Sequence, residues 1–357
     1  MLRRRLGRTN FEVSIVGFGG IPIARRTRSK AIRIVQRAIE LGVNFIDTAR
    51  SYGDSEDKIG EAIKGYRDKL FIATKSHYRT KKEVVDSIRE SMRRLQLDKL
   101  DLIQMHSVDD NDLLEECLGK GGVYEAMHEA RQAGLVDFIG ISGHKNEVLV
   151  KAVKTGMFDT VLASYNLTND DAAKELFPLA KELDIGVIVM KPLGGGALAI
   201  PPEAERFQVA DRAIASAEAA LRFVLSNPHI STAIPGMGTL REVEDDVLLG
   251  YTPQVMSLAD AEQLQRRARK VGFTFCQGCG YCLPQCPEGI DIPEVFKLQV
   301  LYQQYGMINY AHDAYRESYE MKVAQCTECR ACTERCPAEL DIPELLKKAR
   351  LILGSHS

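Results

Sequence analysis

The stretch VNFIDTARSYGDSEDKIGEAIKGYRDKLFIATK, residues 43–75, sets the pattern that decides the fold. A short apolar run, VNFI, precedes a segment of helical period, and a second apolar run, LFIAT, follows it. Alternation of this kind is typical of parallel strands joined through right-handed helical crossovers. The stretch therefore predicts one unit of an α/β fold.

Six more apolar runs extend this pattern along the chain. The eight predicted strands are residues 13–20, 43–46, 70–74, 100–105, 135–142, 159–164, 185–190 and 230–235. The predicted helices are residues 29–42, 55–65, 81–95, 123–134, 146–156, 171–183 and 216–228. Eight units in roughly 240 residues favour a closed (β/α)8 TIM barrel. An open doubly wound sheet is the alternative, although no GxGxxG turn follows the first strand. Residues before Val13 are expected to form a hairpin around Gly7 that plugs the barrel floor.

Composition indicates a globular protein with one large and one small domain. The chain has 357 residues, of which 45% are hydrophobic and 27% charged, and its net charge is -2. This balance gives no reason to expect nucleic acid or a membrane surface as partner. The first residues lack the apolar run of a secretory signal, and no run of 18 apolar residues follows, so we expect a cytoplasmic protein.

Eight of the nine cysteines lie in two similar runs. The runs are CQGCGYCLPQCP at 276–287 and CTECRACTERCP at 326–337, and they repeat with a period of 50 residues together with a following DIPE segment. DIPE predicts a helix start, with Asp as the N-cap residue. We therefore expect a barrel over 1–258 and a small α-helical ferredoxin-like iron-sulfur domain over 270–353.

The C-x2-C-x2-C-x3-C-P spacing is that of bacterial-type ferredoxins, where the fourth cysteine of each run binds the other cluster. We therefore expect two 4Fe-4S clusters. The first is assigned to Cys276, Cys279, Cys282 and Cys336, and the second to Cys326, Cys329, Cys332 and Cys286. A pair of zinc sites is the alternative, but zinc would need only C-x2-C pairs. Disulfides do not fit a cytoplasmic location, and Cys117 is expected to be inert.

Four ionisable side chains follow consecutive predicted strands, at the edge where a barrel places its active site. They are Asp47, Tyr52, Lys75 and His106. Taken singly, each also fits a solvated charge, a packing residue or a core histidine. Taken together, with D-T-A-x-x-Y-G-x-S-E at 47–56, GIS at 140–142 and the later KPLGGG and IPG stretches, they resemble the aldo-keto reductase superfamily over about residues 1–250. The tail, at about 270–350, resembles the helical dicluster ferredoxins.

The first resemblance implies a catalytic tetrad. Tyr52 would donate the proton to a carbonyl oxygen, with its pKa lowered by Lys75, while Asp47 would hold the lysine and His106 would orient the carbonyl. Implied nucleotide contacts are Ser142, Met190, Lys191, Leu193, Gly194, Gly236, Met237 and Thr239. The glycines at 194–196 fit a flexible loop equally well.

The sequence also departs from the family's usual pattern. Met190 and Leu162 stand where a tyrosine and a glutamine usually hold the nicotinamide. Gly236 and Glu242 replace the basic clamp on the NADP phosphate, so NADP and NAD both stay open and Glu242 favours NAD.

Two functions remain for the whole chain. The first is NAD(P)H-dependent reduction of a small carbonyl compound, or the reverse oxidation of an alcohol, with an appended two-cluster module. The alternative is an electron-transfer protein that works with a flavoprotein or ferredoxin partner. A third interpretation gives the tail a docking role alone. Hydride transfer moves two electrons whereas each cluster accepts one, so the purpose of the clusters is the open question.

Overall fold

A computed structural model describes most of the chain. It covers residues 1–194, 198, 206–209, 212–252, 256–270, 276, 282–303, 308–336 and 340–354. Among the predicted site residues, Cys279 lies outside this set, as do Gly195, Gly196 and Pro337 of the quoted motifs.

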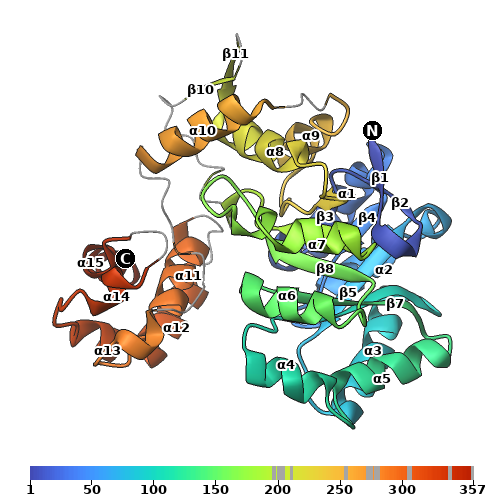
Figure 1. Ribbon diagram of the computed structural model, residues 1–357, viewed down its shortest axis with the longest axis horizontal. Helices are drawn as coiled ribbons and strands as arrows, with labels where there is room; N and C mark the ends of the chain where they lie inside the picture. The colour runs from blue at the N-terminus through green and yellow to red at the C-terminus, as the bar shows by residue number, and fades with distance from the viewer. Residues whose placement is uncertain are drawn as a thin grey trace.

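The first two-thirds of the chain form a closed parallel barrel surrounded by helices (Figure 1). Its strands are β3 (Phe18–Gly19), β4 (Phe45–Asp47), β5 (Phe71–Ser76), β6 (Leu100–Met105), β7 (Val136–Gly143), β8 (Thr160–Ser164), β9 (Gly186–Met190) and β12 (Thr232–Ala233). Each of them pairs in parallel with the next. Parallel bridges from Val16 to Ala233 and from Gly19 to Gly236 join the first strand to the last. The (β/α)8 prediction is confirmed, and the open sheet is excluded.

The predicted helices also form. They are α1 (Arg28–Glu40), α2 (Ser55–Ala62), α3 (Lys81–Leu95), α5 (Val123–Gln132), α6 (Asn146–Lys154), α7 (Leu176–Glu182) and α8 (Ser216–Ser226). The sequence analysis did not predict helices α4 (Asn111–Leu118) and α9 (Leu240–Leu248), nor the hairpin of β10 (Arg206–Val209) and β11 (Arg212–Ala215). Helix α4 begins because the Asp110 carboxylate accepts the N–H groups of Asp112 and Leu113, at 2.8 and 3.1 Å.

An N-terminal hairpin closes the barrel floor, as predicted. Strand β1 (Arg3–Arg5) pairs antiparallel with β2 (Glu12–Ser14), so the predicted strand 13–20 is split between this hairpin and β3. Gly7, at the turn, has φ +49, and a Cβ atom there would lie 2.2 Å from the Gly186 nitrogen. Leu6 is fully buried and packs inside the barrel with Phe45, Phe71 and their neighbours. The hairpin thus seals one end and leaves the opposite rim for the site.

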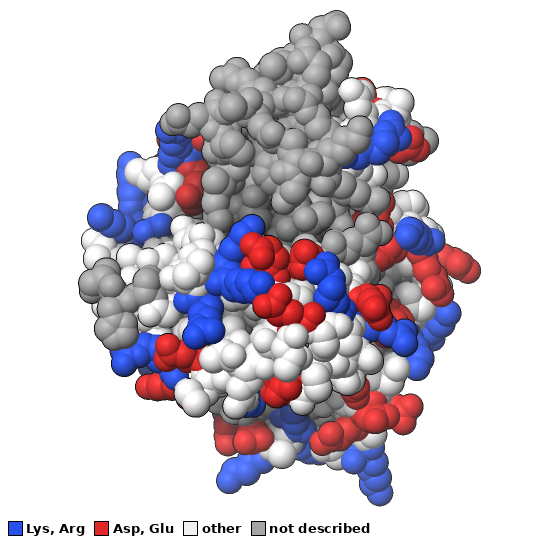
Figure 2. Space-filling view, turned by 90° about the vertical axis from the view of Figure 1, so that its left-hand side faces the viewer, with Lys and Arg blue, Asp and Glu red and all other residues white. Residues whose placement is uncertain are grey.

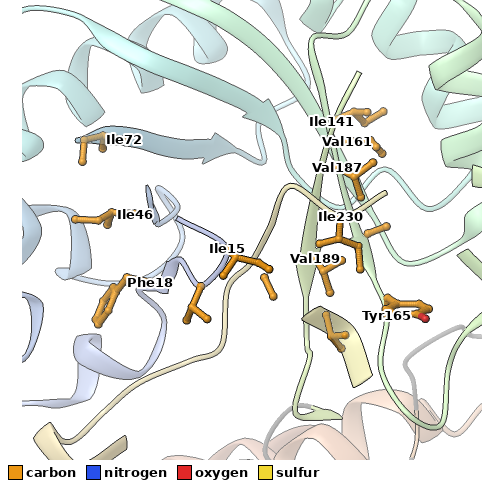
Figure 3. Packing of buried hydrophobic residues seen from close by; sticks show 14 of the residues in the cluster. Ile15, Phe18, Ile46, Ile72, Ile141, Val161, Tyr165, Val187, Val189 and Ile230 are labelled. Atoms are coloured by element: carbon orange, nitrogen blue, oxygen red, sulfur yellow. The ribbon is translucent and has the colours of Figure 1, made fainter. Parts of the chain in front are cut away.

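A second apolar layer lies between the strands and the surrounding helices. Figure 3 shows part of it, including Ile46, Ile72, Val161 and Val187. Helix α10 (Leu258–Lys270) belongs to this layer, because Leu264 is only 2% exposed and is part of the same hydrophobic core. Thus α10 is packed on the barrel as a helix.

The C-terminal helices have a separate hydrophobic core. They are α11 (Ile292–Gln303), α12 (Ile308–Ser318), α13 (Glu320–Ala324), α14 (Ala331–Glu334) and α15 (Ile342–Gly354). Both DIPE segments start a helix as predicted, and the Asp291 carboxylate accepts the Glu294 N–H at 3.2 Å. Val295, Tyr315 and Leu353 are fully buried in this core. We call these helices and the cysteine loops the module.

The outer face of the molecule on the module side carries both signs of charge. Figure 2 shows Lys and Arg interspersed with Asp and Glu among the described residues. In the part of the chain that the structure describes, no helix is long and apolar enough to cross a membrane.

The floor hairpin yields a stability prediction. Replacing Leu6 with Ala removes a fully buried side chain, so the free energy of unfolding should fall by about 2–5 kcal/mol. Leu2, in the same hairpin, is 43% exposed, and Leu2→Ala should cost less than about 1 kcal/mol. Urea unfolding followed by circular dichroism measures both values. Equal losses for the two variants would mean that Leu6 does not plug the floor.

Candidate functional site

The four predicted tetrad residues lie together at the rim opposite the hairpin. Asp47 is the last residue of β4, Lys75 lies near the end of β5, and His106 directly follows β6. Tyr52 lies in the turn between β4 and α2. Its ring centroid is 4.9 Å from the Lys75 Nζ and 5.8 Å from the His106 ring centroid. Parallel strands that end at one edge bring these distant residues into contact, as expected.

Lys75 and Asp47 form an ion pair that is almost completely buried. Their side chains are 2% and 3% exposed, and the Lys75 Nζ donates to Asp47 Oδ1. It also donates to the Thr48 carbonyl at 2.8 Å. Burial alone would lower the pKa of Lys75, but Asp47 and Tyr52 together raise it. Lys75 is therefore an ammonium at neutral pH.

Gln104 is part of this site and was missed by the sequence analysis. Its Nε2 donates to Asp47 Oδ2 at 3.0 Å from the neighbouring strand β6. Each carboxylate oxygen of Asp47 thus accepts a hydrogen bond, and the two bonds together fix the orientation of the Asp47 side chain toward Lys75. A glutamine inside the apolar run LDLIQM was the available signal, because a strand buried on both faces rarely contains a polar residue without a partner.

A second buried network supports the turn that carries Tyr52. Glu56 is fully buried, accepts from Thr74 Oγ1 at 2.7 Å and pairs with Arg50 at 3.1 Å. Ser55 Oγ donates to the Gly20 carbonyl at 2.8 Å. These bonds join the turn to β5 and to the first strand, so Tyr52 is held by the frame of the barrel.

Burial decides the protonation of Tyr52. It raises the pKa of the phenol, and the positive charge of Lys75 opposes this without reversing it. The net direction is opposite to the lowered pKa expected from the sequence. The phenol is therefore protonated at neutral pH.

His106 is neutral for a related reason. Burial lowers its pKa to about 3, and the positive charge of Lys75 acts in the same direction. Its Nδ1 lies 3.4 Å from Ser51 Oγ. A neutral imidazole carries one N–H and can donate it to an uncharged acceptor.

The predicted nucleotide contacts fall on two neighbouring parts of the rim. Ser142, near the end of β7, donates to the Met105 carbonyl and accepts from the Ser107 N–H, both at 3.0 Å. Met190 ends β9, and Lys191 follows with φ +54. The Lys191 carbonyl accepts from Asn166 Nδ2 at 3.1 Å and from the Gly194 N–H at 2.8 Å. Leu193 packs against the main core.

The remaining contacts lie between β12 and α9. Gly236 is exposed, but Met237 is fully buried in the core, so only its backbone can face a ligand. Thr239 caps α9 through its Oγ1, which accepts the Glu242 N–H at 3.1 Å. Glu242 Oε2 accepts the N–H groups of Gly238 and Thr239, at 2.6 and 3.1 Å. A carboxylate thus already occupies the amides at this helix start.

His144 is held at the same rim by an aspartate that the sequence analysis did not identify. Asp109 accepts from the His144 N–H, and its Oδ2 lies 2.9 Å from His144 Nδ1. Burial lowers the pKa of His144, and the positive charge of Lys191 adds to this.

Four cysteines of the module line one pocket, between the first and second runs. Cys286, Cys326, Cys329 and Cys332 share it with Pro343 and Leu346 of α15. This is the crossed set assigned from the spacing, and thiol donors around an apolar wall fit an iron-sulfur cluster. Cys276, Cys282 and Cys336 contact the module core. Cys286, Cys326, Cys329, Cys332 and Cys336 of the module are thiols that form no disulfide. Within the described residues, no three candidate ligands are grouped closely enough to hold a single metal ion.

Both the barrel and the module match known protein families. A sequence model of the aldo/keto reductase family matches residues 15–262, and one of the 4Fe-4S dicluster domain matches residues 275–340. L-galactose dehydrogenase of Arabidopsis thaliana is 31% identical, with 68% of this chain and 86% of that protein covered. The uncharacterized oxidoreductase YqkF of Bacillus subtilis is 26% identical, with 69% and 90% covered.

Solved structures share the barrel. An aldo-keto reductase from Bacillus halodurans in its holo form has a TM-score of 0.64 and 27% identity, with 74% of this chain and 96% of that chain covered. One from Klebsiella pneumoniae in complex with NADPH has a TM-score of 0.63 and 24% identity, with 75% and 95% covered, which shows the fold alone. On the extent of the family match, this chain belongs to the aldo/keto reductase family, and its oxidoreductase barrel is followed by a 4Fe-4S dicluster domain.

Proposed function

We propose that the barrel reduces the carbonyl group of a small molecule, or oxidises the corresponding alcohol, with a nicotinamide nucleotide. The observation that carries the proposal is the buried Lys75–Asp47 ion pair beneath Tyr52, with a neutral His106 beside it. When bound, the nucleotide supplies or accepts the hydride.

The tetrad residues then have distinct roles. His106 donates its N–H to the carbonyl oxygen and orients it. Tyr52 gives its phenolic proton to the same oxygen as negative charge develops there. The Lys75 ammonium stabilises the phenolate that remains, and Asp47 with Gln104 keeps that ammonium in place. One hydride and one proton added to the C=O group give the alcohol.

The choice between NADP and NAD rests on Glu242. A 2'-phosphate at the start of α9 would face this carboxylate and compete with it for the Gly238 and Thr239 amides. The Arg241 side chain is 91% exposed, and its Nε lies 3.5 Å from Asp245 Oδ2. The geometry therefore favours NAD, and NADP is the alternative.

We further propose that the module holds two 4Fe-4S clusters with crossed ligation. Cys286, from the first run, joins Cys326, Cys329 and Cys332 in the second cluster, which is supported by their shared pocket. Cys336 is assigned to the first cluster with Cys276, Cys279 and Cys282, as in the sequence prediction.

The tetrad predicts a loss of activity without a loss of iron. Tyr52→Phe should lower kcat for aldehyde reduction by about 100-fold or more, because the proton donor is removed. Tyr78→Phe is the matched control, since Tyr78 lies near the rim and stacks on His77 at 4.3 Å. Steady-state kinetics and iron content are measured on both. A Tyr52→Phe enzyme as active as Tyr78→Phe would refute the assignment.

The raised pKa of Tyr52 predicts different pH profiles for carbonyl reduction and for alcohol oxidation. Because burial raises this pKa above its ordinary value of 10.0, the phenol persists at neutral pH. Reduction, which needs the phenol, should stay level between about pH 7 and 9, whereas oxidation, which needs the phenolate, should rise about tenfold per pH unit. Profiles of kcat in both directions test this. A reduction rate that declines between pH 6 and 8 would contradict it.

Crossed ligation predicts which cluster a single cysteine controls. Cys286→Ala should damage the second cluster and leave the first, so iron content should fall to about half and one paramagnetic resonance signal should persist. Cys117→Ala, a buried cysteine of α4, is the control and should keep all iron. Loss of the first signal only would show that Cys286 binds within its own run.

A further inference from the structure

We propose that His144, held by Asp109, is a substrate-binding residue that accepts a hydrogen bond from a hydroxyl group close to the reacting carbonyl. The favoured substrates are then small hydroxylated aldehydes or ketones. This inference rests on the proposed function, because it names the substrate class of the same site. Both residues lie in the described part of the barrel, and neither belongs to the tetrad.

His144 lies beside the loop that carries His106. It directly follows β7, whereas His106 directly follows the neighbouring strand β6, and Asp109 is three residues further along the same loop. The Val108 N–H donates to the Ser142 carbonyl at 2.8 Å. This bond fastens the loop to the end of β7, so Asp109 and His144 come from two segments that run side by side at the rim.

Gly143 allows the loop to approach β7 this closely. A Cβ atom at Gly143 would lie 2.6 Å from the Val108 carbonyl oxygen and 3.1 Å from Asp109 Oδ1. A larger residue there would push the loop away. The backbone N–H of His144 uses the same close approach, because it donates to Asp109 Oδ1. The glycine of the SGH sequence at 142–144 thus brings Asp109 against His144.

Asp109 determines which nitrogen of His144 carries the proton. Burial alone would raise the pKa of Asp109, but hydrogen bonds from His144 lower it, so the group is a carboxylate. Its Oδ2 lies 2.9 Å from His144 Nδ1, and a carboxylate only accepts hydrogen bonds, so Nδ1 carries a proton. Burial lowers the pKa of His144, so its ring is neutral at neutral pH. In this tautomer, Nε2 has a lone pair and is an acceptor.

The Nε2 atom of His144 is available to a ligand. Among the residues that the structure describes, none forms a hydrogen bond with it. The side chain is 22% exposed, and Nε2 is not fully buried. An acceptor in a partly desolvated position is satisfied by a ligand that brings an N–H or O–H group. A carbonyl oxygen has no proton to donate, so His144 would recognise a second polar group of the substrate.

The strand register places His144 within reach of a small substrate bound at His106. Met105 pairs with Ile141, so His106 and Ser142 come next on the two adjacent strands. His144 is two residues further along, which is about 7 Å in an extended chain, and adjacent strands lie about 5 Å apart. A substrate of two or three carbons can therefore meet both imidazoles. Its carbonyl oxygen accepts from His106, and a hydroxyl on a neighbouring carbon donates to His144.

A bound nucleotide offers another donor, the carboxamide N–H of its nicotinamide. The substrate hydroxyl is favoured because Asp109, which sets the tautomer of His144, belongs to the loop that carries His106. The acceptor is therefore tied to the residue that holds the carbonyl. Asp109 itself is a positioning residue, because it acts through His144.

Two aldehydes of equal length test the substrate class at saturating nucleotide. Glyceraldehyde carries hydroxyl groups and propionaldehyde carries none. In His144→Phe, the ratio of kcat/KM for glyceraldehyde to that for propionaldehyde should fall about tenfold, and the propionaldehyde value should change less than about twofold. His77→Phe, which removes an exposed histidine after β5, should keep the native ratio. An unchanged ratio in His144→Phe overturns the proposal. An equal loss for both aldehydes also overturns it, and indicates a nucleotide contact or a role in folding.

Nitrogen-15 spectra of the histidine-labelled full chain test the role of Asp109 without turnover. The His144 signals are those lost in His144→Phe. In the native protein Nδ1 should carry the proton, and Asp109→Asn, whose amide can donate to Nδ1, should move it to Nε2. Glycerol should shift the native Nε2 signal more than propan-1-ol does at the same concentration.

These spectra also separate the inference from the proposed function. A proton on Nε2 in the native protein, or equal shifts with glycerol and propan-1-ol, overturns the role of His144. Turnover of neither aldehyde counts against carbonyl reduction, whereas the Nε2 signal still decides whether His144 binds a hydroxyl group.

Discussion

The site depends on the ion pair between Lys75 and Asp47. Burying a lone ammonium or carboxylate costs several kcal/mol, so neither side chain could occupy this rim without the other. Three adjacent strands contribute, since β4 supplies Asp47, β5 supplies Lys75 and β6 supplies Gln104. The parallel register of these strands is thus also the geometry of the site. The same ammonium contributes to the neutrality of His106 and stands ready to stabilise the phenolate of Tyr52.

The barrel could be predicted from the sequence because apolar runs alternate repeatedly with segments of helical period. The strand ends followed from the apolar runs, and parallel pairing then placed Asp47, Lys75 and His106 at one edge. Residues that act through a partner elsewhere in the chain were harder to find. Gln104 and Asp109 matter because of Asp47 and His144, which lie 57 and 35 residues away in sequence. Local patterns contain no such information.

The sequence analysis expected a lowered pKa for Tyr52, and this prediction was wrong for a related reason. A sequence identifies the neighbours that raise or lower a pKa, but not how far water is excluded from the group. Here exclusion of water outweighs the ammonium. Helix α4 was not predicted from the sequence, and its start depends on Asp110, whose carboxylate accepts two backbone N–H groups. The cysteine repeat needed no such information, since its spacing alone indicates which thiols share a pocket.

The ring of strands separates two groups of predicted site residues. Counting around the closed sheet, β5 and β9 stand four strands apart in an eight-stranded ring and therefore face each other across the barrel. Lys75 lies on β5 and Lys191 directly follows β9. The lysine that supports the proton donor is thus built on one side of the rim, and a predicted nucleotide contact lies on the other.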